Sequence, residues 1–351
     1  MKRRILYIAP LTSGQTSFYR YRALQRLQQD VIPFDLARYN FRLVKMNALA
    51  SRFPMGPLIS KVNADLAAAV IKEKPEIVWF DRPTQFTPKT ISSIQESGAQ
   101  TVCYNQDNPF GPRNDGCWRQ FYKIYRMLDL HCLFRNVDIA RYQGWGLNYI
   151  KIQLSYDPLE HYLPPAGWSD EDRTREVSYI GSPYEDRPQF LLALARIYNL
   201  PVTISGPRWQ KVFNKDELRR YTLGGMLRDA EYRENIWKSK INITFITQKN
   251  EEDVAHKAFE IAACGGFLLA LRSPGHEACF QEGKEAEFFS SLEECAAKIR
   301  YYLDHPEERE EIAKRGCERA MRSGYDNDTQ LQRVLDKMNE LHIPVGEVTN
   351  A

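Results

Sequence analysis

The sequence predicts an α/β protein made of two doubly wound, Rossmann-like domains. Short β-branched or aromatic runs alternate with longer stretches of helical period, which is the pattern of βαβ units and parallel sheets. The chain has 351 residues, enough for two domains at roughly 150 residues each. A segment rich in Pro and acidic residues interrupts the alternation near the middle, which indicates a boundary between the two domains.

The first half of the chain contains strand candidates separated by helix candidates. Expected strands lie at residues 5–9, 31–36, 77–81, 101–105, 131–134 and 149–154. Expected helices lie at residues 17–28, 58–72, 88–96, 118–128 and 138–143. We interpret the aromatic, basic stretch 118–128 as a helix that buries its aromatic face. These elements form one predicted domain over residues 1–155.

Residues 156–176 contain Asp157-Pro158, Pro164-Pro165 and an acidic run, which is the composition of a surface linker. The alternation then restarts. Expected strands lie at residues 177–180, 202–205, 241–246 and 267–271, and expected helices at 189–198, 231–238 and 254–264, before a mostly helical stretch from residue 292. We therefore place a second domain at 177–325 and a helical tail at 326–351.

Composition excludes several classes of protein. The chain has 48 Lys plus Arg against 45 Asp plus Glu, without a block of five like charges, so we expect no nucleic-acid partner. The longest apolar run, 262–271, is too short for a transmembrane helix, which leaves only peripheral membrane contact open. The seven cysteines are scattered and contain no C-x-x-C pair, so we expect buried thiols in a reducing, cytoplasmic setting.

The most informative segment is 252–266. A helix at 254–264 would bury its apolar residues and end at a Gly pair, with His256, Lys257 and Glu260 near its exposed N-terminal half. A helix start offers N–H groups and a positive dipole end, and Lys257 adds a full charge, so a diphosphate fits there. Glu260 can accept hydrogen bonds from ribose hydroxyls. An ordinary amphipathic helix with a Gly cap is the alternative.

The same segment resembles the signature of GT-B glycosyltransferases of the group 1 kind, especially the CgeB-like (spore-maturation-protein-like) branch. In that signature a basic residue, Phe-Glu, small residues and Cys-Gly precede a buried strand, as they do from Lys257 to Gly265. The wider pattern has two Glu residues separated by seven others, which is the spacing of Glu252 and Glu260. The resemblance implies that the first Glu faces the donor sugar and the second the ribose. It also implies a GT-B fold and a tail helix at 329–341 that packs back on the first domain.

Two turns after strands in the second domain resemble parts of the same family's donor domain. Gly181 and Ser182 follow one expected strand, with Arg187 shortly after, and Gly206 follows the next. A glycine lets backbone approach a nucleotide, and Arg187 can pair with phosphate oxygens. The alternatives are plain turn residues and a surface ion pair. We interpret Trp209 as structural.

Two loops of the first domain also resemble the family. Gly14 lies in the loop after the first strand, where the family has a Gly-containing loop beside donor phosphate and acceptor, although neither G-x-x-x-x-G-K-[ST] nor G-x-G-x-x-G is present. Residues 104–109 resemble its acidic loop, which makes Asp107 the candidate general base. The alternative is an Asx turn before a proline. Asp81 is a second candidate base, and His131 fits a core position.

We expect no metal and no cofactor. The only D-x-D string, 326–328, is explained by helix capping, so Lys257, Arg187 and a helix N-terminus would stabilise the departing nucleoside diphosphate. The resemblance implies a metal-independent glycosyltransferase that moves a sugar from a nucleoside-diphosphate-sugar donor to a hydroxyl of a surface glycan, lipid-linked saccharide or protein glycan. The alternatives are a non-catalytic protein that binds a sugar nucleotide or glycan, a sugar-nucleotide epimerase, and a glycan phosphorylase.

Overall fold

The structure, a computed structural model, describes residues 2–39, 52–112 and 116–342. The chain divides into two compact units, which are described separately here. Unit 1 comprises Met1–Gln153, Lys249–Glu251 and Asn327–Ala351, and unit 2 comprises Leu154–Gln248 and Glu252–Asp326. Among the helices in the described ranges, none is both long and apolar enough to cross a bilayer.

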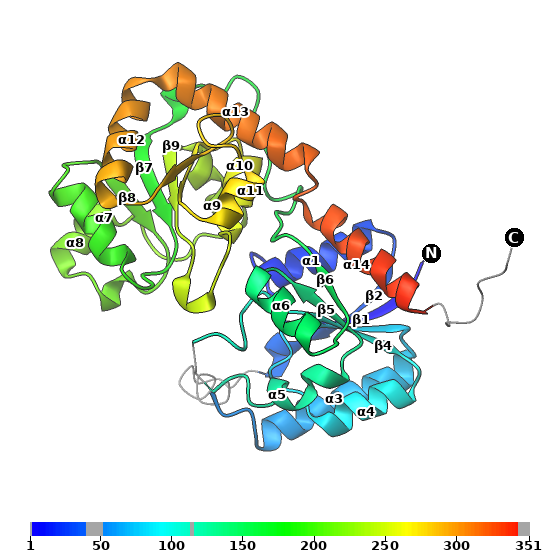
Figure 1. Ribbon diagram of the computed structural model, residues 1–351. Helices are drawn as coiled ribbons and strands as arrows, with labels where there is room; N and C mark the ends of the chain where they lie inside the picture. Colours follow the sequence, from blue (N-terminus) through cyan, green and yellow to red (C-terminus); the bar gives the residue numbers. More distant parts are fainter. Residues whose placement is uncertain (1, 40–51, 113–115, 343–351) are drawn as a thin grey trace, which may run out of the picture. The chain divides into compact units, whose positions relative to one another are not determined.

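Unit 1 is built on a six-stranded sheet in the order β2-β1-β3-β4-β5-β6, in which every neighbouring pair is parallel (Figure 1). Its strands are β1 (Arg4–Ala9), β2 (Asp30–Asp35), β3 (Ile77–Asp81), β4 (Gln100–Tyr104), β5 (Leu130–Leu133) and β6 (Tyr149–Lys151). Between β1 and β3, Ile5 lies opposite Ile77 and Ile8 opposite Phe80. Because helices cover both faces, these central strands are nearly continuous apolar runs.

The helices of unit 1 form a layer on each face of its sheet. They are α1 (Thr16–Arg26), α3 (Pro57–Glu73), α4 (Pro88–Glu96), α5 (Phe121–Ile124), α6 (Asn136–Gly144) and α14 (Asn327–His342), with 3-10 turns at Leu36–Tyr39 and Tyr125–Met127. Helices α3, α4 and α5 pack Leu66, Ile91 and Phe121 on one face, and α1, α6 and α14 lie on the other (Figure 1). Thr87 caps α4 by accepting from the N–H of Thr90.

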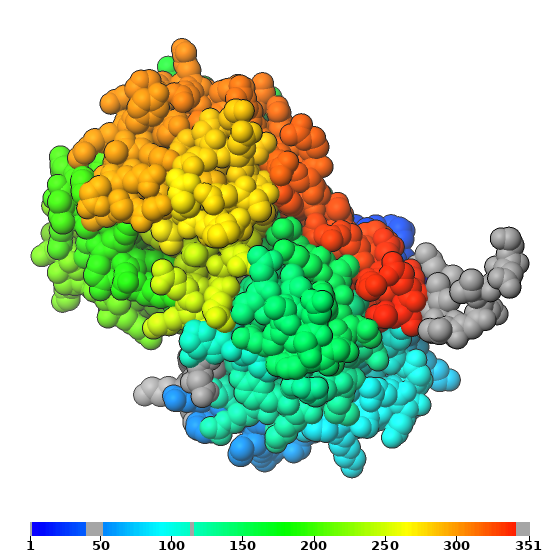
Figure 2. Space-filling view, in the orientation of Figure 1, coloured from blue at the N-terminus to red at the C-terminus, as the bar shows by residue number. Residues whose placement is uncertain are grey.

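Helix α14 groups with unit 1 although it comes last in the sequence. The carboxylate of Asp328 accepts from Nε of Arg26 at 2.9 Å and from its Nη2 at 2.5 Å. Further along, Asn339 accepts from Nη1 of Arg3 at 3.0 Å. Figure 2 shows the red atoms of α14 against blue atoms from the start of the chain. The carboxylate of Asp328 in the D-x-D string is therefore used in an ion pair that fixes this helix.

Unit 2 is built on a five-stranded parallel sheet in the order β11-β10-β9-β7-β8. Its strands are β7 (Arg175–Ile180), β8 (Val202–Ser205), β9 (Ser239–Thr244), β10 (Leu268–Leu271) and β11 (Glu287–Phe289). Its helices are α7 (Arg187–Arg196), α8 (Lys215–Tyr221), α9 (Asp229–Trp237), α10 (His256–Ala263), α11 (Pro274–Cys279), α12 (Leu292–Asp304) and α13 (Pro306–Arg322), with 3-10 turns at Asp170–Asp172 and Trp209–Lys211. A further 3-10 turn, Gln248–Asn250, spans the point where the chain passes from unit 2 into the Lys249–Glu251 segment of unit 1. Helices α7, α8 and α12 pack into the core cluster on one face of the sheet.

The segment expected to be a linker is held on unit 2, and we name residues 154–176 the strap. Near its start, the N–H of Tyr156 donates to the carbonyl of Tyr325 at 3.0 Å. Near its end, Arg309, which is 1% exposed, donates to the carboxylate of Asp170 at 2.5 Å. Its proline-rich composition therefore belongs to a segment with little regular structure that is nevertheless packed within unit 2.

The α/β fold class is confirmed, with differences at individual elements. The helix expected at 118–128 contains only the short α5 and a 3-10 turn, although Trp118 and Phe121 are buried as expected. Aromatic and β-branched residues have low helix propensity, so packing decides the backbone there. The sequence analysis also missed α8, α11 and β11. A capping box between Asn214 and Glu217 marks the start of α8.

All seven cysteines are buried and free, which confirms the expected role as buried thiols. His131 is also buried, and its Nε2 donates to the carbonyl of Tyr125 at 2.8 Å. It is therefore a core histidine, as its sequence context indicates.

Acidification should destabilise the protein through its buried histidines. Burial lowers the pKa of His131 and His276 from 6.5 to about 4. The unfolded chain then binds more protons than the folded chain between these values, so stability is lost as the pH falls from 6.5 to 4, by about 3 kcal/mol per histidine. Calorimetric melting at a series of pH values should show that the free energy of unfolding falls less steeply with decreasing pH in His131→Gln than in the wild type. The glutamine keeps an N–H donor at this position. A decline as steep as in the wild type would contradict this account.

Candidate functional site

Helix α10 starts without a side-chain cap. Its N-cap residue is Ala255, whose carbonyl accepts from the N–H of Ala258 at 3.0 Å and whose side chain makes no capping hydrogen bond. The first N–H groups of a helix have no intrahelical partner and carry the positive end of the helix dipole. An anion at this helix start would therefore meet backbone N–H groups that the N-cap side chain does not engage.

The carboxylate of Glu260 is buried, which corrects the exposed position expected from the sequence. Its side chain is only 8% exposed, and the hydroxyl of Tyr232 donates to Oε2 at 2.5 Å. The other oxygen, Oε1, lies 3.8 Å from Nε2 of His161 and 3.7 Å from Nε2 of His256, and it accepts no hydrogen bond from the described residues. Oε2 is thus held by a hydrogen bond, whereas Oε1 is open, meaning that it can still accept one.

The surroundings of Glu260 keep it ionised. Burial alone would raise its pKa. Electrostatic interactions with His256, His161 and Lys257 and the hydrogen bond from Tyr232 together have a larger, opposite effect, and the pKa is lowered to about 2. A carboxylate that is ionised and has one unengaged oxygen is a strong acceptor for hydroxyl groups.

Two basic residues open α10. The Nε2 of His256 donates to the carbonyl of Ser155 at 2.8 Å, so this side chain is tied to the strap. The ammonium of Lys257 lies 5.2 Å from the ring centre of Tyr232 and makes no hydrogen bond or ion pair with residues in the described ranges. Lys257 therefore supplies an unpaired positive charge at the helix start.

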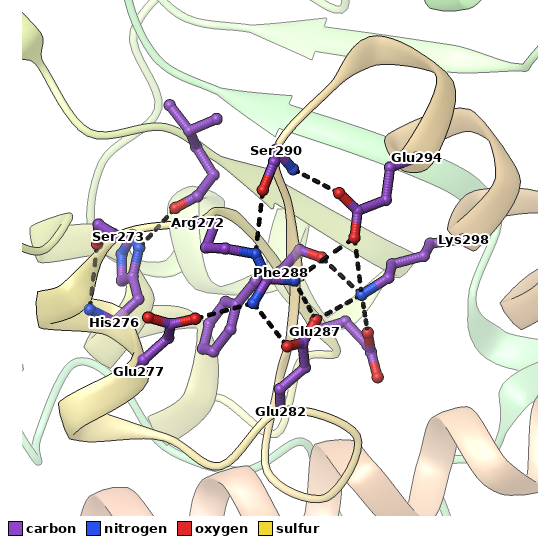
Figure 3. Close-up of polar contacts among 11 residues, drawn as sticks. Arg272, Ser273, His276, Glu277, Glu282, Glu287, Phe288, Ser290, Glu294 and Lys298 are labelled. Carbon is purple, nitrogen blue, oxygen red and sulfur yellow. Dashed lines mark hydrogen bonds and ion pairs between the residues drawn. The ribbon is translucent and has the colours of Figure 1, made fainter.

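The loop after β10, whose residues Ser273 and His276 appear in Figure 3, fixes the position of the α10 start. The hydroxyl of Ser273 donates to the carbonyl of Asp253 at 2.6 Å, and Nε2 of His276 accepts from the N–H of Ala255 at 3.0 Å. A Cβ on Gly275 would lie 2.1 Å from the carbonyl oxygen of Asp253. The backbone leading into α10 is therefore packed directly on the start of α11.

A network of charges secures the same loop. Arg272 donates to Glu277 at 2.8 Å and to Glu282 at 2.6 Å, and Lys298 donates to Glu282 at 2.7 Å and to Glu287 at 2.5 Å. Figure 3 shows both cations converging on Glu282. Hydrogen bonds from Arg272, against the opposing effect of burial, lower the pKa of Glu282 to about 2. These ion pairs join the loop after β10 to the segment before β11, and that segment and β11 to α12.

The glycines that end β7 and β8 contact each other through backbone. The N–H of Gly181 donates to the carbonyl of Ser205 at 2.8 Å, and its own carbonyl accepts from Nε1 of Trp209 at 2.8 Å. Gly206 has φ +139°, and a Cβ there would lie 2.1 Å from the carbonyl oxygen of Gly181. Both glycines are thus required by packing, and Ser182 follows in the turn after β7.

Arg187 and Glu252 both hold the loop after β9. Arg187 is 8% exposed, and its Nη2 donates to the carbonyl of Ile246 at 3.1 Å and to the hydroxyl of Thr247 at 2.9 Å. Glu252 accepts from the N–H of Thr247 at 2.7 Å. Arg187 is therefore not the exposed side chain that a surface ion pair would require, and both residues set the loop that precedes α10.

Unit 1 has a cavity of about 300 Å³, lined by the residues before and at the start of α1, the end of β3 and residues 106–107. Asp107 lines it and accepts from Nε of Arg82 at 2.6 Å, with about a third of its side chain exposed. Gly14, with φ +77°, forms a turn just before the lining residues Gln15 and Thr16.

The second candidate base, Asp81, is enclosed. Its carboxylate accepts from Nε and Nη2 of Arg20 at 2.7 and 3.1 Å and from the hydroxyl of Tyr7 at 2.7 Å. A buried carboxylate paired in this way is a structural element of unit 1 and a poor proton acceptor. Of the two acids, Asp107 is the more exposed, with 36% of its side chain accessible against 9% for Asp81.

The structure distributes the predicted residues between the two units. Gly14 and Asp107 belong to unit 1; Gly181, Ser182, Arg187, Gly206, Glu252, His256, Lys257 and Glu260 belong to unit 2. Sequence reasoning missed Tyr232, His161 and Arg82, which contact these residues. No local pattern marks Tyr232, and His161 lies in a segment with linker composition. Among the described residues, no group of three or more His, Cys, Asp or Glu is placed to hold a metal ion.

Comparison with known proteins identifies the fold. Residues 187–336 match the model of a family described as "Glycosyl transferase-like". Sucrose-phosphate synthase from Thermosynechococcus elongatus is 11% identical, with a TM-score of 0.68 over 96% of this chain and 100% of that chain. Anabaena HepE, solved in complex with UDP-glucose, is 14% identical, with a TM-score of 0.62 over 96% of this chain and 100% of that chain.

The same fold also occurs in a protein described as an epimerase. A putative UDP-N-acetylglucosamine 2-epimerase from Listeria monocytogenes is 12% identical, with a TM-score of 0.56 over 97% of this chain and 96% of that chain. A search of curated proteins gives no match. The chain has the GT-B fold. Within it, a glycosyltransferase-like segment covers most of unit 2 and part of α14.

Gly206→Ala should destabilise unit 2. The new Cβ would overlap the carbonyl oxygen of Gly181, and φ +139° disfavours any side chain, so we expect a loss of roughly 2–4 kcal/mol in the free energy of unfolding. Gly225→Ala is the matched control, because a Cβ there has nothing within 4 Å. Denaturant unfolding of both variants measures the effect, and equal stability of the two would contradict the proposed backbone contact.

Proposed function

We propose that this protein is a glycosyltransferase of the CgeB-like branch that transfers a sugar from a nucleoside-diphosphate-sugar donor to a hydroxyl acceptor. In this proposal unit 2 binds the donor and unit 1 the acceptor. The acceptor is a surface glycan, a lipid-linked saccharide or a protein glycan, and transfer takes place in the cytoplasm without a metal ion.

The observation that carries the proposal is the start of α10. A buried, ionised Glu260 with one open oxygen lies on the same short helix as an unpaired Lys257 and uncapped N–H groups. Ribose hydroxyls suit the open carboxylate oxygen, and a diphosphate suits the cation and the helix start. The family match covers this helix, and the UDP and UDP-glucose complexes of HepE support a uridine nucleotide as the first candidate.

Asp107 is the proposed base in an inverting reaction. Its carboxylate takes the proton of the acceptor hydroxyl while that oxygen bonds to the anomeric carbon. The bond from the anomeric carbon to the diphosphate oxygen breaks, and the electron pair leaves with the nucleoside diphosphate. Lys257 and the first N–H groups of α10 then stabilise the negative charge on the leaving group. Arg82 keeps the carboxylate oriented toward the cavity.

A second candidate function is a sugar-nucleotide epimerase, favoured by the fold shared with the Listeria protein. A non-catalytic protein that binds a sugar nucleotide is a third. Calorimetric titration with UDP, GDP, dTDP, CDP and ADP, each with and without EDTA, is the first test. Binding that survives chelation supports the metal-free donor site, and transfer to an added acceptor separates a transferase from the other two. Absence of binding by all five nucleotides would refute the proposal.

Lys257→Ala should weaken binding of the nucleoside diphosphate by about tenfold or more, because the loss removes a charge-assisted contact. Lys314→Ala removes the same charge from an exposed position on α13 and should leave the affinity unchanged. Isothermal titration of both variants with UDP gives the comparison. Equal affinities would show that the diphosphate does not bind at the start of α10.

Asp107→Asn should lower the rate of transfer by about 10²–10⁴-fold while UDP affinity stays at the wild-type value, because the base acts only on the acceptor. Asp65→Asn, on α3, is the control, since Asp65 pairs with Lys61 outside the cavity. Single-turnover kinetics with the donor found in the titration would measure both. Unimpaired transfer by Asp107→Asn would remove this residue from the mechanism.

A further inference from the structure

His161 brings the strap into the proposed donor site. It lies between Asp157 and the Pro-rich part of the strap, is 4% exposed, and places Nε2 3.8 Å from Oε1 of Glu260. Its Nδ1 accepts from the N–H of Asp157 at 3.1 Å. Because Nδ1 is an acceptor, the proton of the neutral ring lies on Nε2, the nitrogen that faces Glu260.

His161 is neutral in the folded protein near pH 7. Burial lowers its pKa more than Glu260 and Asp157 raise it, and His256 lowers it as well. A charged imidazole at this place would form an ion pair with Oε1 and occupy the oxygen that a ligand needs. The neutral ring instead turns one N–H toward Oε1 at a distance too long for a hydrogen bond.

Tyr232 completes the support of Glu260. The ring of His161 packs edge-on against the ring of Tyr232, with centroids 5.8 Å apart and planes at 89°. The hydroxyl of Tyr232 in turn anchors Oε2 of Glu260. The strap, α9 and α10 therefore meet at one carboxylate, whose rotation is blocked by a hydrogen bond on one side and by an imidazole on the other.

We propose that His161 and Tyr232 are positioning residues that hold Glu260 with Oε1 directed at the ribose hydroxyls of a nucleoside diphosphate. The inference rests on the proposed function and adds a role for the strap. Neither residue has to touch the ligand. If either residue is replaced, Glu260 can rotate. The preference for a ribonucleotide over its dideoxy analogue is then lost, while the affinity for the rest of the nucleotide is largely kept.

The experiment measures ribose selection as a ratio of affinities. The dissociation constants of UDP and of 2′,3′-dideoxy-UDP are determined for the full chain by calorimetry, with GDP and its dideoxy analogue as a second pair. For the wild type we expect the ribonucleotide to bind about 10- to 100-fold more tightly, as a hydroxyl bound to a carboxylate requires. In His161→Gln and Tyr232→Phe the carboxylate of Glu260 is no longer held in place, so the ratio of the two affinities should fall close to 1. The affinity for the dideoxy analogue should change little.

Two matched variants are the controls. Tyr302→Phe removes a buried hydroxyl that donates to Glu287 at 2.8 Å in the same unit, and His131→Gln replaces a buried histidine of unit 1. Both should keep the wild-type ratio. Because Tyr232→Phe keeps the ring, it remains informative if His161→Gln does not fold.

The outcomes separate the inference from the proposed function. A wild-type ratio that persists in both His161→Gln and Tyr232→Phe overturns the positioning role and leaves the donor site intact. Equal loss of affinity for the ribonucleotide and its dideoxy analogue would also overturn it, because a merely structural role predicts that result. Failure of the wild type to bind either ribonucleotide refutes the proposed function and the inference together.

Discussion

The parallel direction of every strand pair is the constraint on which the arrangement of functional residues depends. In such sheets each loop that follows a strand emerges at the same edge. In unit 2 this places Gly181, Gly206 and the loop leading to α10 at one edge, and in unit 1 it does the same for Asp81 and Asp107. Close backbone contact between neighbouring loops then fixes their positions, which explains why Gly206 carries no side chain.

Much of the fold could be predicted from the sequence, because alternating strands and helices carry strong periodic signals. Helix α10, its Gly termination and the buried β10 were expected nearly as they occur. The failures share one physical cause. Periodicity assigns polar residues to the solvent face, yet Glu260 and Arg187 are polar residues inside unit 2, where partners from distant segments compensate their charge. Those partners, such as Tyr232 and the strap, leave no local pattern in the sequence.

The motif residues of the candidate site could therefore be predicted from the sequence, but the residues that contact them could not. Lys257 and Glu260 follow from a motif, whereas His161 comes from a stretch whose composition is that of a linker. The strap has little regular structure because its prolines disfavour a helix, but hydrogen bonds and an ion pair still attach it to the rest of unit 2. A segment that separates two folding units in the sequence can thus place a residue beside the candidate site.

The buried thiols have a practical consequence. Burial raises the pKa of Cys103, Cys132, Cys264 and Cys295, and that of Cys317 to about 11, which keeps these groups as unreactive thiols at neutral pH. A single cysteine introduced on an exposed helix position would then be labelled selectively by a maleimide dye in the native chain. Two such positions, one in each unit, would allow fluorescence energy transfer to follow the distance between the units during turnover, without first replacing the natural cysteines.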